Sequence, residues 1–469
     1  MTDTKRTLLA GFLIALLTLF IPFYLNFIGV DVGASDADPV GANVLDEAPP
    51  AVPETSSSLP IEKGSFSADK ADRLFNASII TSKYHVSLSN VGGGSLNSFS
   101  VVDYGEKSYQ YLGGYNELGE YEPSQPVSLL RESDPFVCAP CLRVAGEQLS
   151  ELFNITSVEL YQNGVAQSLP FVSLDKNINL ENSDSLVVSM SGQTSVGRVN
   201  KKTVFYNDSF LIQHLYTTDK TNDIYLEWSE GIMPTEKNLT EEITYSQAFI
   251  AQNKEIEDLT FSPSSLEDEV ATVNKRGLTD WVAVRNKYFI NAFISKNAVS
   301  GELSAKVSEL SLGTFVPVYG VGLGLGNVNS FAVSQFFGPL DIDVIGESNT
   351  YLDRVMNFGW LPIQPFSRSV LWILKTLHIS GLNYGIILIL FAFLIRLLTG
   401  PLTKKSFQST QKMQTVQPKM KKIQAKYKND SQRLNQEMVK LYKAEGVNPL
   451  GGCLPMLIQM PLLFSLFIV

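Results

Sequence analysis

The sequence predicts a multi-domain membrane protein in which an α-helical transmembrane core is joined to a large, mostly β domain. Three observations carry this prediction. Uncharged apolar stretches lie near both ends of the 469-residue chain. Between them, short runs of alternating polar and apolar residues are separated by Gly, Asn and Asp, a pattern typical of antiparallel sheets. The net charge is −10, yet residues 396–445 carry 12 Lys or Arg against 3 Asp or Glu, which suggests two compartments or two partners.

Residues 1–30 are predicted to form an N-terminal transmembrane anchor. Residues 7–30 contain no charge, and as a helix they would reach ~36 Å, enough to cross a hydrocarbon core of ~30 Å. The alternative is a cleaved signal peptide, but this stretch is longer than the ~7–15 apolar residues of such peptides, so a retained anchor is favoured. Residues 31–74 are rich in Pro, Ala, Ser and acids, and we expect a flexible linker there.

Residues 75–345 are predicted to form the β domain, as a sandwich or a barrel. Within it, Cys138 and Cys141 form "CAPC", the Cys-x-Pro-Cys form of thioredoxin-like redox sites. Those sites open a helix after a strand, and no such helix is indicated here. A local disulfide or another loop staple is therefore favoured. With one further cysteine and three histidines in the chain, no metal or cofactor site is predicted.

Residues 346–380 are expected to include an amphipathic helix lying in the membrane interface, because Val370, Ile373, Leu374 and Leu377 recur at helical spacing. The alternative is a core helix of the preceding domain.

Residues 381–402 form the second predicted span. Residues 451–469 are the start of a third span in which the sequence stops, so we expect the front part of a longer, multi-pass protein. The loop between these spans carries 11 Lys or Arg, which places it in the cytoplasm and the β domain outside.

Residues 403–450 predict a basic hairpin of two amphipathic helices, broken at "KND" and with Pro418 kinking the first helix or shifting its start. One interpretation is a mobile arm that meets partners or anionic lipids through adaptable methionines and lysines. The other is a solvated loop whose helices pack on each other, and both remain open. The candidate contact residues are Met413, Met420, Lys421, Lys422 and Met438.

Arg396 is the only charge between Lys375 and Lys404. An arginine costs roughly 2.5–3.5 kcal/mol at a bilayer centre, although near a helix end it can extend to the headgroups at little cost. Gln459 is expected at comparable depth on the next span. Polar groups at such depth normally face a bundle interior or a water-filled cavity, so the pair suggests a wet, positive pocket that opens toward the cytoplasm and attracts acidic segments.

These segments resemble a known family. "LIRLLTGPLTKKSFQSTQKMQTVQPKMKKIQAKYK" and "QEMVKLYKAEGVNPLGGCLPMLIQMPLL" closely resemble the YidC family of bacterial membrane protein insertases. "LEWSEGIMPTEKN", "WVAVRNKYFINAFI" and "FFGPLDIDVI" resemble the family's periplasmic domain. The resemblance implies an all-β sandwich of the galactose-mutarotase-like type, and a five-span core that forms a groove in the inner leaflet.

The resemblance further implies that Arg396 and Gln459 line that substrate groove, and that substrate helices slide along Met460, Leu463 and Phe467. It implies no enzymatic chemistry. The expected location is the bacterial inner membrane, crossed several times. The expected partners are nascent membrane proteins, the Sec translocon, the ribosome and the signal recognition particle pathway, and anionic lipids, with no nucleic-acid specificity.

Two other functions compete with insertion. One is a membrane-anchored periplasmic protein that binds or modifies carbohydrate, which would need histidines and carboxylates gathered in the β domain. His85 and His214 are isolated in the sequence, with no motif around them. The other is a polytopic transporter or channel, which should show polar residues throughout its spans.

Overall fold

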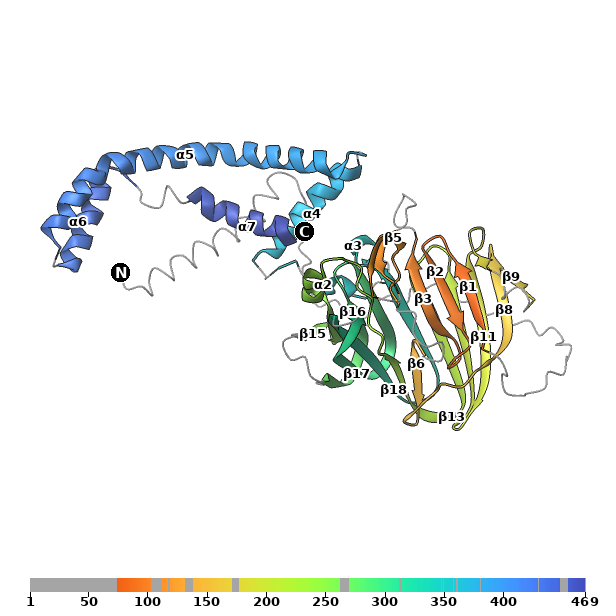
Figure 1. Cartoon of the computed structure of the whole chain (residues 1–469). Helices are drawn as coiled ribbons and strands as arrows, with labels where there is room; N and C mark the ends of the chain where they lie inside the picture. The colour runs from red at the N-terminus through yellow and green to blue at the C-terminus, as the bar shows by residue number, and fades with distance from the viewer. Residues whose placement is uncertain are drawn as a thin grey trace, which may run out of the picture. The chain divides into compact units, whose positions relative to one another are not determined.

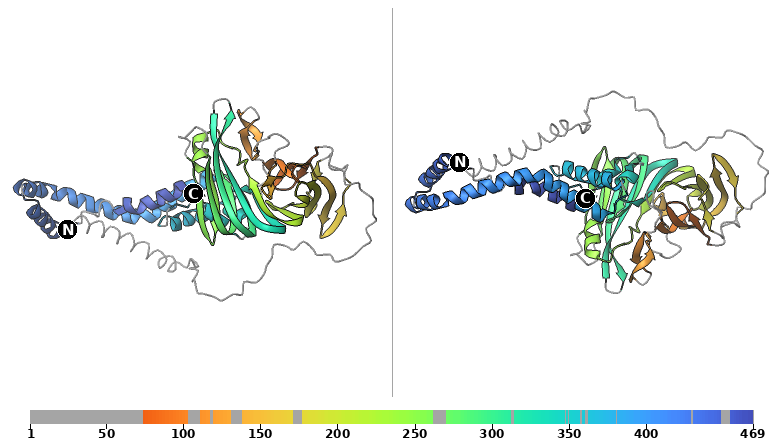
Figure 2. Two further views of the ribbon diagram at one scale, coloured as in Figure 1. Left: turned by 90° about the horizontal axis from the view of Figure 1, so that it is seen from below. Right: turned by 90° about the horizontal axis from the view of Figure 1, so that it is seen from above.

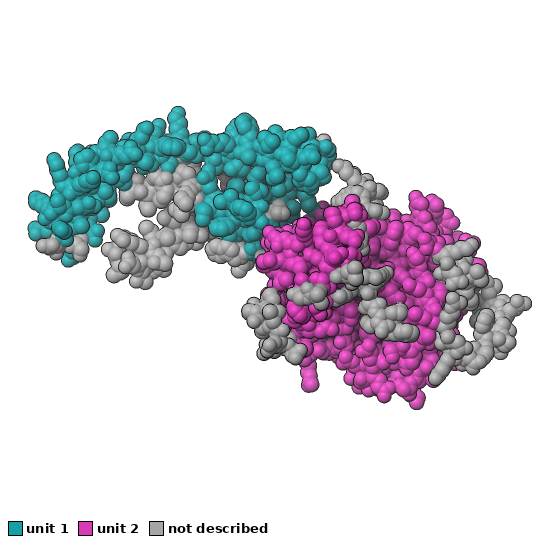
Figure 3. Space-filling model, in the orientation of Figure 1, with its two compact units in different colours: residues 1–47, 357–469 teal, residues 48–356 magenta. Residues whose placement is uncertain are grey.

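The computed structural model describes residues 74–468 except for 103–110, 117–118, 131–137, 171–176, 262–269, 312–313, 347, 349, 357, 360–361, 380, 429 and 448–453. The predicted anchor and nearly all of the predicted linker thus lie outside the described residues. The chain divides into two compact units, which are coloured separately in Figure 3. We call residues 48–356 the β unit and residues 357–469, which group with 1–47, the helical unit.

The β unit is built on one large antiparallel sheet (Figure 1). Its strands, in spatial order, are β15 (Glu255–Leu259), β14 (Gln247–Gln252), β16 (Ala271–Arg285), β17 (Phe289–Ser311), β18 (Thr314–Pro339), β13 (Leu211–Trp228), β12 (Gly197–Tyr206), β11 (Ser185–Thr194), β8 (Asn154–Gln162) and β9 (Val165–Ser168). A short branch adds β6 (Cys141–Val144), which pairs with β13 and with β7 (Glu147–Gln148).

A smaller sheet covers part of the large one, as the two views of Figure 2 also show. Its strands are β10 (Ile178–Asn179), β1 (Asn76–Ile80), β2 (Tyr84–Ser89) and β3 (Ser95–Val101), and β1 pairs with β10 in parallel. A separate hairpin consists of β4 (Leu112–Tyr115) and β5 (Tyr121–Pro126).

Aromatic side chains join the two sheets into a sandwich. Phe99 on β3 stacks on Phe337 of β18 with ring centroids 4.3 Å apart. Trp228 on β13 meets Phe337 edge-on at 5.5 Å. All three side chains are buried, and buried positions alternate along β11 and β13 as expected for strands with one covered face. The predicted all-β sandwich is therefore confirmed, and the barrel alternative is not the one found.

The β unit extends past residue 345, where the sequence suggested that it ends. After β18, α3 (Ile342–Gly346) and the 3₁₀ helix η2 (Leu352–Val355) pack on the sandwich, and both Leu352 and Val355 are buried in its core. The indole N–H of Trp281 also donates a hydrogen bond to the Thr350 carbonyl oxygen at 2.8 Å. Residues 346–356 therefore belong with the sandwich and not with the amphipathic helix that follows them.

Cys138 and Cys141 are joined by a disulfide. Both cysteines are buried, and the chain continues from Cys141 as strand β6. A thioredoxin-like site would continue as a helix. The sequence allowed a local disulfide or another link within the loop, and the structure contains the disulfide.

The helical unit contains α4 (Gln364–Ile379), α5 (Tyr384–Lys426), α6 (Ser431–Ala444) and α7 (Leu454–Ile468). The side chain of Asn383 caps α5 by accepting a hydrogen bond from the Gly385 N–H at 2.8 Å. α5 then continues for 43 residues through Pro401 and Pro418. A proline removes one backbone hydrogen bond from a helix, and α5 tolerates two such losses. The second predicted span and the first hairpin helix thus form one continuous helix, and Pro418 does not start a new one.

Candidate functional site

The first half of α5 is the part of the described chain best suited to cross a membrane. Residues Tyr384–Pro401 have a mean hydropathy of 2.0 and form the one described helix that is long and apolar enough to do so. Only 11% of this segment is buried within the molecule. Its buried positions, Ile387 and Phe391, lie one turn apart on a single face. The remaining apolar surface is open, as expected where lipid or another apolar partner covers a helix.

Arg396 projects from this exposed apolar segment. Its side chain is exposed, and no hydrogen-bond or ion-pair partner occurs for it within the described residues. Along the helix it lies nine residues after Ile387, or ~14 Å at the α-helical rise. Apolar side chains surround it on α5: Phe393 is 66% exposed and Leu397 is 62% exposed. An unpaired cation in such a setting is positioned to attract a negatively charged group that enters from solution.

α7 presents one apolar stripe to its surroundings. Met460, Leu463, Phe464 and Phe467 recur at helical spacing and are 38%, 49%, 47% and 79% exposed. Gln459 is partly buried and lies one turn before Leu463, beside the stripe. The three residues expected to guide substrates therefore share one open face. Phe464 shares that face and was missed by sequence reasoning, although the i, i+3, i+4, i+7 spacing of the set would have included it.

α4 and α7 pack against each other, and both contact α5. Ser465 on α7 is fully buried, and its hydroxyl donates a hydrogen bond to the Pro461 carbonyl oxygen at 2.6 Å. Val370 is buried on α4, while Trp372 is 60% exposed. The amphipathic helix thus belongs to the helical unit, and the alternative of a core helix of the β domain does not hold.

Arg396 and Gln459 lie on contacting helices, but no hydrogen bond between their side chains is present in the described chain.

α6 packs against the second half of α5. The Tyr442 hydroxyl lies 4.0 Å from the Met420 sulfur, and Lys419 Nζ pairs with Glu445 Oε1 at 2.6 Å. The three methionines proposed as contact residues, Met413, Met420 and Met438, are all partly buried. Lys421 and Lys422 are exposed. Packing within the hairpin therefore occupies much of the methionine surface, whereas the lysines remain available to a partner.

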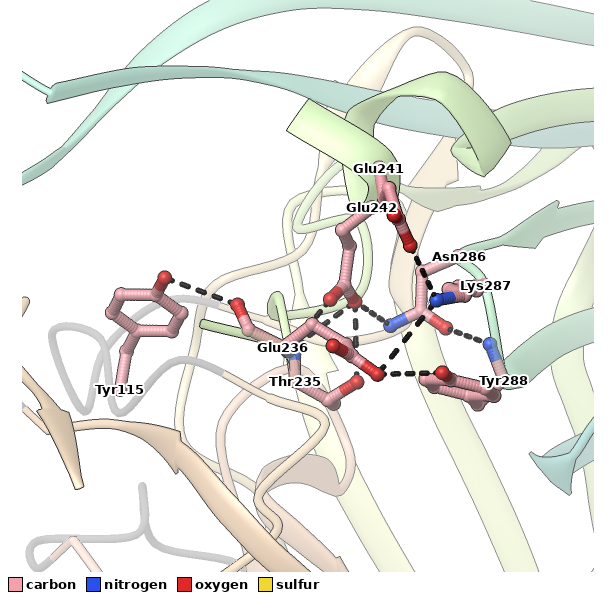
Figure 4. Close-up of polar contacts among 8 residues, drawn as sticks. All are labelled: Tyr115, Thr235, Glu236, Glu241, Glu242, Asn286, Lys287 and Tyr288. Carbon is pink, nitrogen blue, oxygen red and sulfur yellow. Dashed lines mark hydrogen bonds and ion pairs between the residues drawn. The ribbon is translucent and has the colours of Figure 1, made fainter. Parts of the chain in front are cut away.

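A second polar region, which sequence reasoning did not find, lies in the β unit around Glu242 (Figure 4). Glu242 is on the short helix α2 (Leu239–Tyr245) and is 1% exposed. Its Oε1 accepts hydrogen bonds from the Thr235 N–H at 2.9 Å, the Thr235 hydroxyl at 3.2 Å and Asn286 Nδ2 at 2.8 Å. Its Oε2 accepts from the Glu236 N–H at 2.7 Å. Burial raises the pKa of Glu242, and the hydrogen bonds from Thr235 and from the Glu236 N–H oppose that rise.

Figure 4 also shows a surface network beside this carboxylate. Lys287 Nζ bonds Glu241 Oε2 at 2.8 Å and lies 3.8 Å from Glu236 Oε1. The Tyr288 hydroxyl donates to Glu236 Oε1 at 2.5 Å. Glu236, Lys287 and Tyr288 also line an open cavity of about 410 Å³, together with Tyr121 and other residues. The segments "IMPTEKN" and "VRNKYF", which carry part of the family resemblance, therefore meet at this cluster.

His214, one of the two histidines considered for a carbohydrate enzyme, is not among the residues that line that cavity. His214 is fully buried, and its Nε2 contacts Gln335 Oε1 at 2.9 Å. Burial, with a smaller contribution from Lys201, lowers the pKa of His214 to about 3. His214 therefore stays neutral in the folded protein at ordinary pH and forms part of the sandwich core.

Two family models match the chain. Residues 375–469 match the model described as 60Kd inner membrane protein, and residues 151–373 match the YidC periplasmic domain. A galactose mutarotase related enzyme from Lactobacillus acidophilus is similar to 56% of this chain and 97% of its own, at 11% identity and a TM-score of 0.30, which is too low to support any argument.

Three proteins described as membrane protein insertase YidC are among the relatives. The one from Chlorobium phaeovibrioides is 38% identical over 263 residues, covering 53% of this chain and 43% of that protein. The one from Chlorobium limicola is 32% identical over 338 residues, or 70% of this chain and 55% of that protein. The one from Geotalea daltonii is 27% identical over 402 residues, or 83% and 68%.

The chain spans about half the length of the first relatives that it matches. The two family models cover the helical unit from residue 375 and more than half of the β unit. Along the chain, the match to the YidC periplasmic domain precedes the match to the 60Kd inner membrane protein, just as the β unit precedes residues 357–469 of the helical unit. Taken with the relatives, these matches establish that the chain belongs to the YidC family.

Proposed function

We propose that this chain works as a membrane protein insertase in the inner membrane, acting on nascent membrane proteins through an inner-leaflet groove that includes Arg396. The observation that carries the proposal is an exposed arginine within the apolar segment Tyr384–Pro401, with no partner in the part of the chain that the structure describes. Holding a charge at such depth is unfavourable for a simple anchor. A site that receives polar segments gives the charge a function.

The proposed mechanism is a sequence of binding steps without covalent chemistry. A polar, often acidic, tail of the nascent chain enters the groove, where attraction to Arg396 offsets part of the tail's desolvation cost. The apolar segment of the substrate meanwhile passes along the open stripe of Met460, Leu463 and Phe467 into lipid. Burial of about 20 apolar residues in the hydrocarbon core supplies the driving force. The membrane potential assists a negative tail that crosses outward.

The proposed topology is multi-pass, with the basic hairpin in the cytoplasm and the β unit in the periplasm. The Cys138–Cys141 disulfide supports a periplasmic β unit, because such bonds persist in oxidising compartments and are rare in the cytosol. The Lys and Arg surplus of residues 403–450 supports a cytoplasmic hairpin. We further propose the Sec translocon, the ribosome with the signal recognition particle pathway, and anionic lipids as partners. The exposed Lys421 and Lys422 are the candidate contacts on the hairpin.

The test is complementation of a cell depleted of its own insertase by the gene for this protein. Insertion of a substrate with an acidic N-terminal tail is measured by protease protection. We expect Arg396→Ala to reduce insertion about fivefold or more, since the loss of one charge attraction at low dielectric costs at least ~1 kcal/mol. Arg396→Lys should be milder. Lys404→Ala, which removes a cation from the same helix beyond the apolar segment, is the matched control and should insert normally. Full insertion by Arg396→Ala would refute the role given to Arg396.

A further inference from the structure

Two cations and a tyrosine form an exposed cluster at the C-terminal end of the β unit. Lys254 Nζ lies 5.5 Å from the centre of the Tyr351 ring, and the Arg354 guanidinium carbon lies 5.1 Å from it. Arg354 Nη1 also donates a hydrogen bond to the Lys254 carbonyl oxygen at 2.7 Å. All three residues are exposed, Tyr351 by 45%. Because the two ring distances sum to 10.6 Å, the two cationic groups cannot be farther apart than that.

Neither cation is neutralised within the described part of the chain. Glu255 and Asp353 are their sequence neighbours, yet no ion pair joins either acid to Lys254 or Arg354 there. By contrast, Lys275 on the neighbouring strand pairs with Glu257 at 2.8 Å. The cluster is therefore a pair of available positive charges held around an aromatic ring.

The backbone is strained at this cluster. Lys254 has φ of 67° and Tyr351 has φ of 56°, both in the left-handed region. Lys254 follows Asn253, at φ of 50°, in the two-residue turn between β14 and β15. Such turns favour Asn followed by Gly, because a side chain in the left-handed region is sterically strained. An exposed cation–π contact offsets only part of that strain. Fold stability alone would thus favour glycine at position 254.

We propose that Lys254, Tyr351 and Arg354 bind the phosphates of anionic phospholipid headgroups and dock the β unit on the membrane surface. Lys and Arg attract an anionic leaflet, and tyrosine is enriched at membrane–water interfaces. A short connection is compatible with this docking. Only residues 357–363 join the β unit to α4, which the sequence predicts to lie in the membrane interface. This role for the β unit is additional to insertion and uses none of the groove residues.

The experiment compares the full-length protein in nanodiscs of zwitterionic lipid with nanodiscs that contain one third phosphatidylglycerol. Hydrogen exchange is followed in peptides that cover residues 247–259 and 350–356. We expect slower exchange in the anionic discs at both segments, and loss of the difference in 0.5 M salt, where the Debye length is only about 4 Å. Removing one cation should weaken the protection about fivefold, since each basic residue near an anionic surface contributes ~1 kcal/mol.

Lys254→Gly and Arg354→Gln are the test variants, and Lys202→Gln on β12, five strands away from β14 in the sheet, is the matched control. Lys254→Gly should show that weaker protection while its melting temperature stays equal to or above that of the parent, which separates binding from folding. Equal exchange in the two kinds of disc would overturn the proposal. So would full protection in Lys254→Gly, or protection that soluble glycerol phosphate produces equally well in zwitterionic discs.

Discussion

Replacing Glu242 by glutamine should destabilise the β unit by about 2–4 kcal/mol. The buried carboxylate accepts four hydrogen bonds, three on Oε1 and one on Oε2. The amide oxygen of Glu242→Gln can take the place of Oε1, but its NH₂ group then faces the Glu236 N–H. One charge-assisted bond, worth about 1.5–3 kcal/mol, is lost, and a buried N–H without a partner costs ~1–3 kcal/mol. Removing a buried negative charge restores part of the lost folding stability, because burial disfavours the ionised form of Glu242.

The assay is urea unfolding of residues 48–356, whose hydrophobic core is contained within the β unit, with the buried Trp228 and Trp281 as fluorescence probes. Glu241→Gln is the matched control, because the neighbouring Glu241 side chain is 56% exposed and makes one surface ion pair with Lys287. Such pairs contribute ~0–1 kcal/mol. If Glu242→Gln unfolds within about 0.5 kcal/mol of the parent, the account of this carboxylate as the anchor of the Thr235 loop is refuted.

Three further outcomes are expected in the same unfolding assay. Burial lowers the pKa of Lys201 from 10.5 to about 7, so between these values the unfolded chain binds more protons than the folded one, and stability should rise from pH 7 to pH 9. Lys201→Met should flatten that rise, and a parent curve that is already flat would contradict the burial argument. Changing both Cys138 and Cys141 to serine should remove about 2 kcal/mol, the loop entropy of a short disulfide ring; unchanged stability under oxidising conditions would count against a structural bond. Gly192→Ala should cost ~1–3 kcal/mol, because its Cβ would lie 2.4 Å from the buried Phe153 ring, and a neutral result would mean that the ring has room to move.

The sequence was informative wherever a regular period was present. Alternation along strands such as β11 predicted the sandwich, and helical spacing predicted the apolar face of α4. The three residues on the open stripe of α7 were named only through the family resemblance. Boundaries were less predictable. The short helix η2 does not show a hydrophobic period in the sequence, so the burial of Leu352 and Val355 in the sandwich could not be predicted. The predicted span ended at residue 402, yet α5 continues through Pro401 because a helix can lose one backbone hydrogen bond and keep its remaining ones.

The Glu242 cluster could not be predicted, because its members come together only through folding. Thr235 and Asn286 are far apart in the sequence, and a glutamate on a short helix ordinarily faces solvent. The tertiary fold brings both donors to one carboxylate. Arg396 is the opposite case: a single charge in an apolar run is plain in the sequence, whereas its exposure and its lack of a partner in the described chain required the structure.

The central claim is that Arg396 occupies a water-accessible position within the membrane segment of α5. The direct measurement is labelling of Arg396→Cys in inner-membrane vesicles by a charged, membrane-impermeant thiol reagent applied from the cytoplasmic face, with Cys453→Ser as the background. Ile389→Cys, at an apolar position 71% exposed on the same helix, is the control. The account predicts rapid labelling at position 396 and little at position 389. Equal protection of both positions would contradict it, because the arginine would then lie in lipid rather than in a hydrated groove.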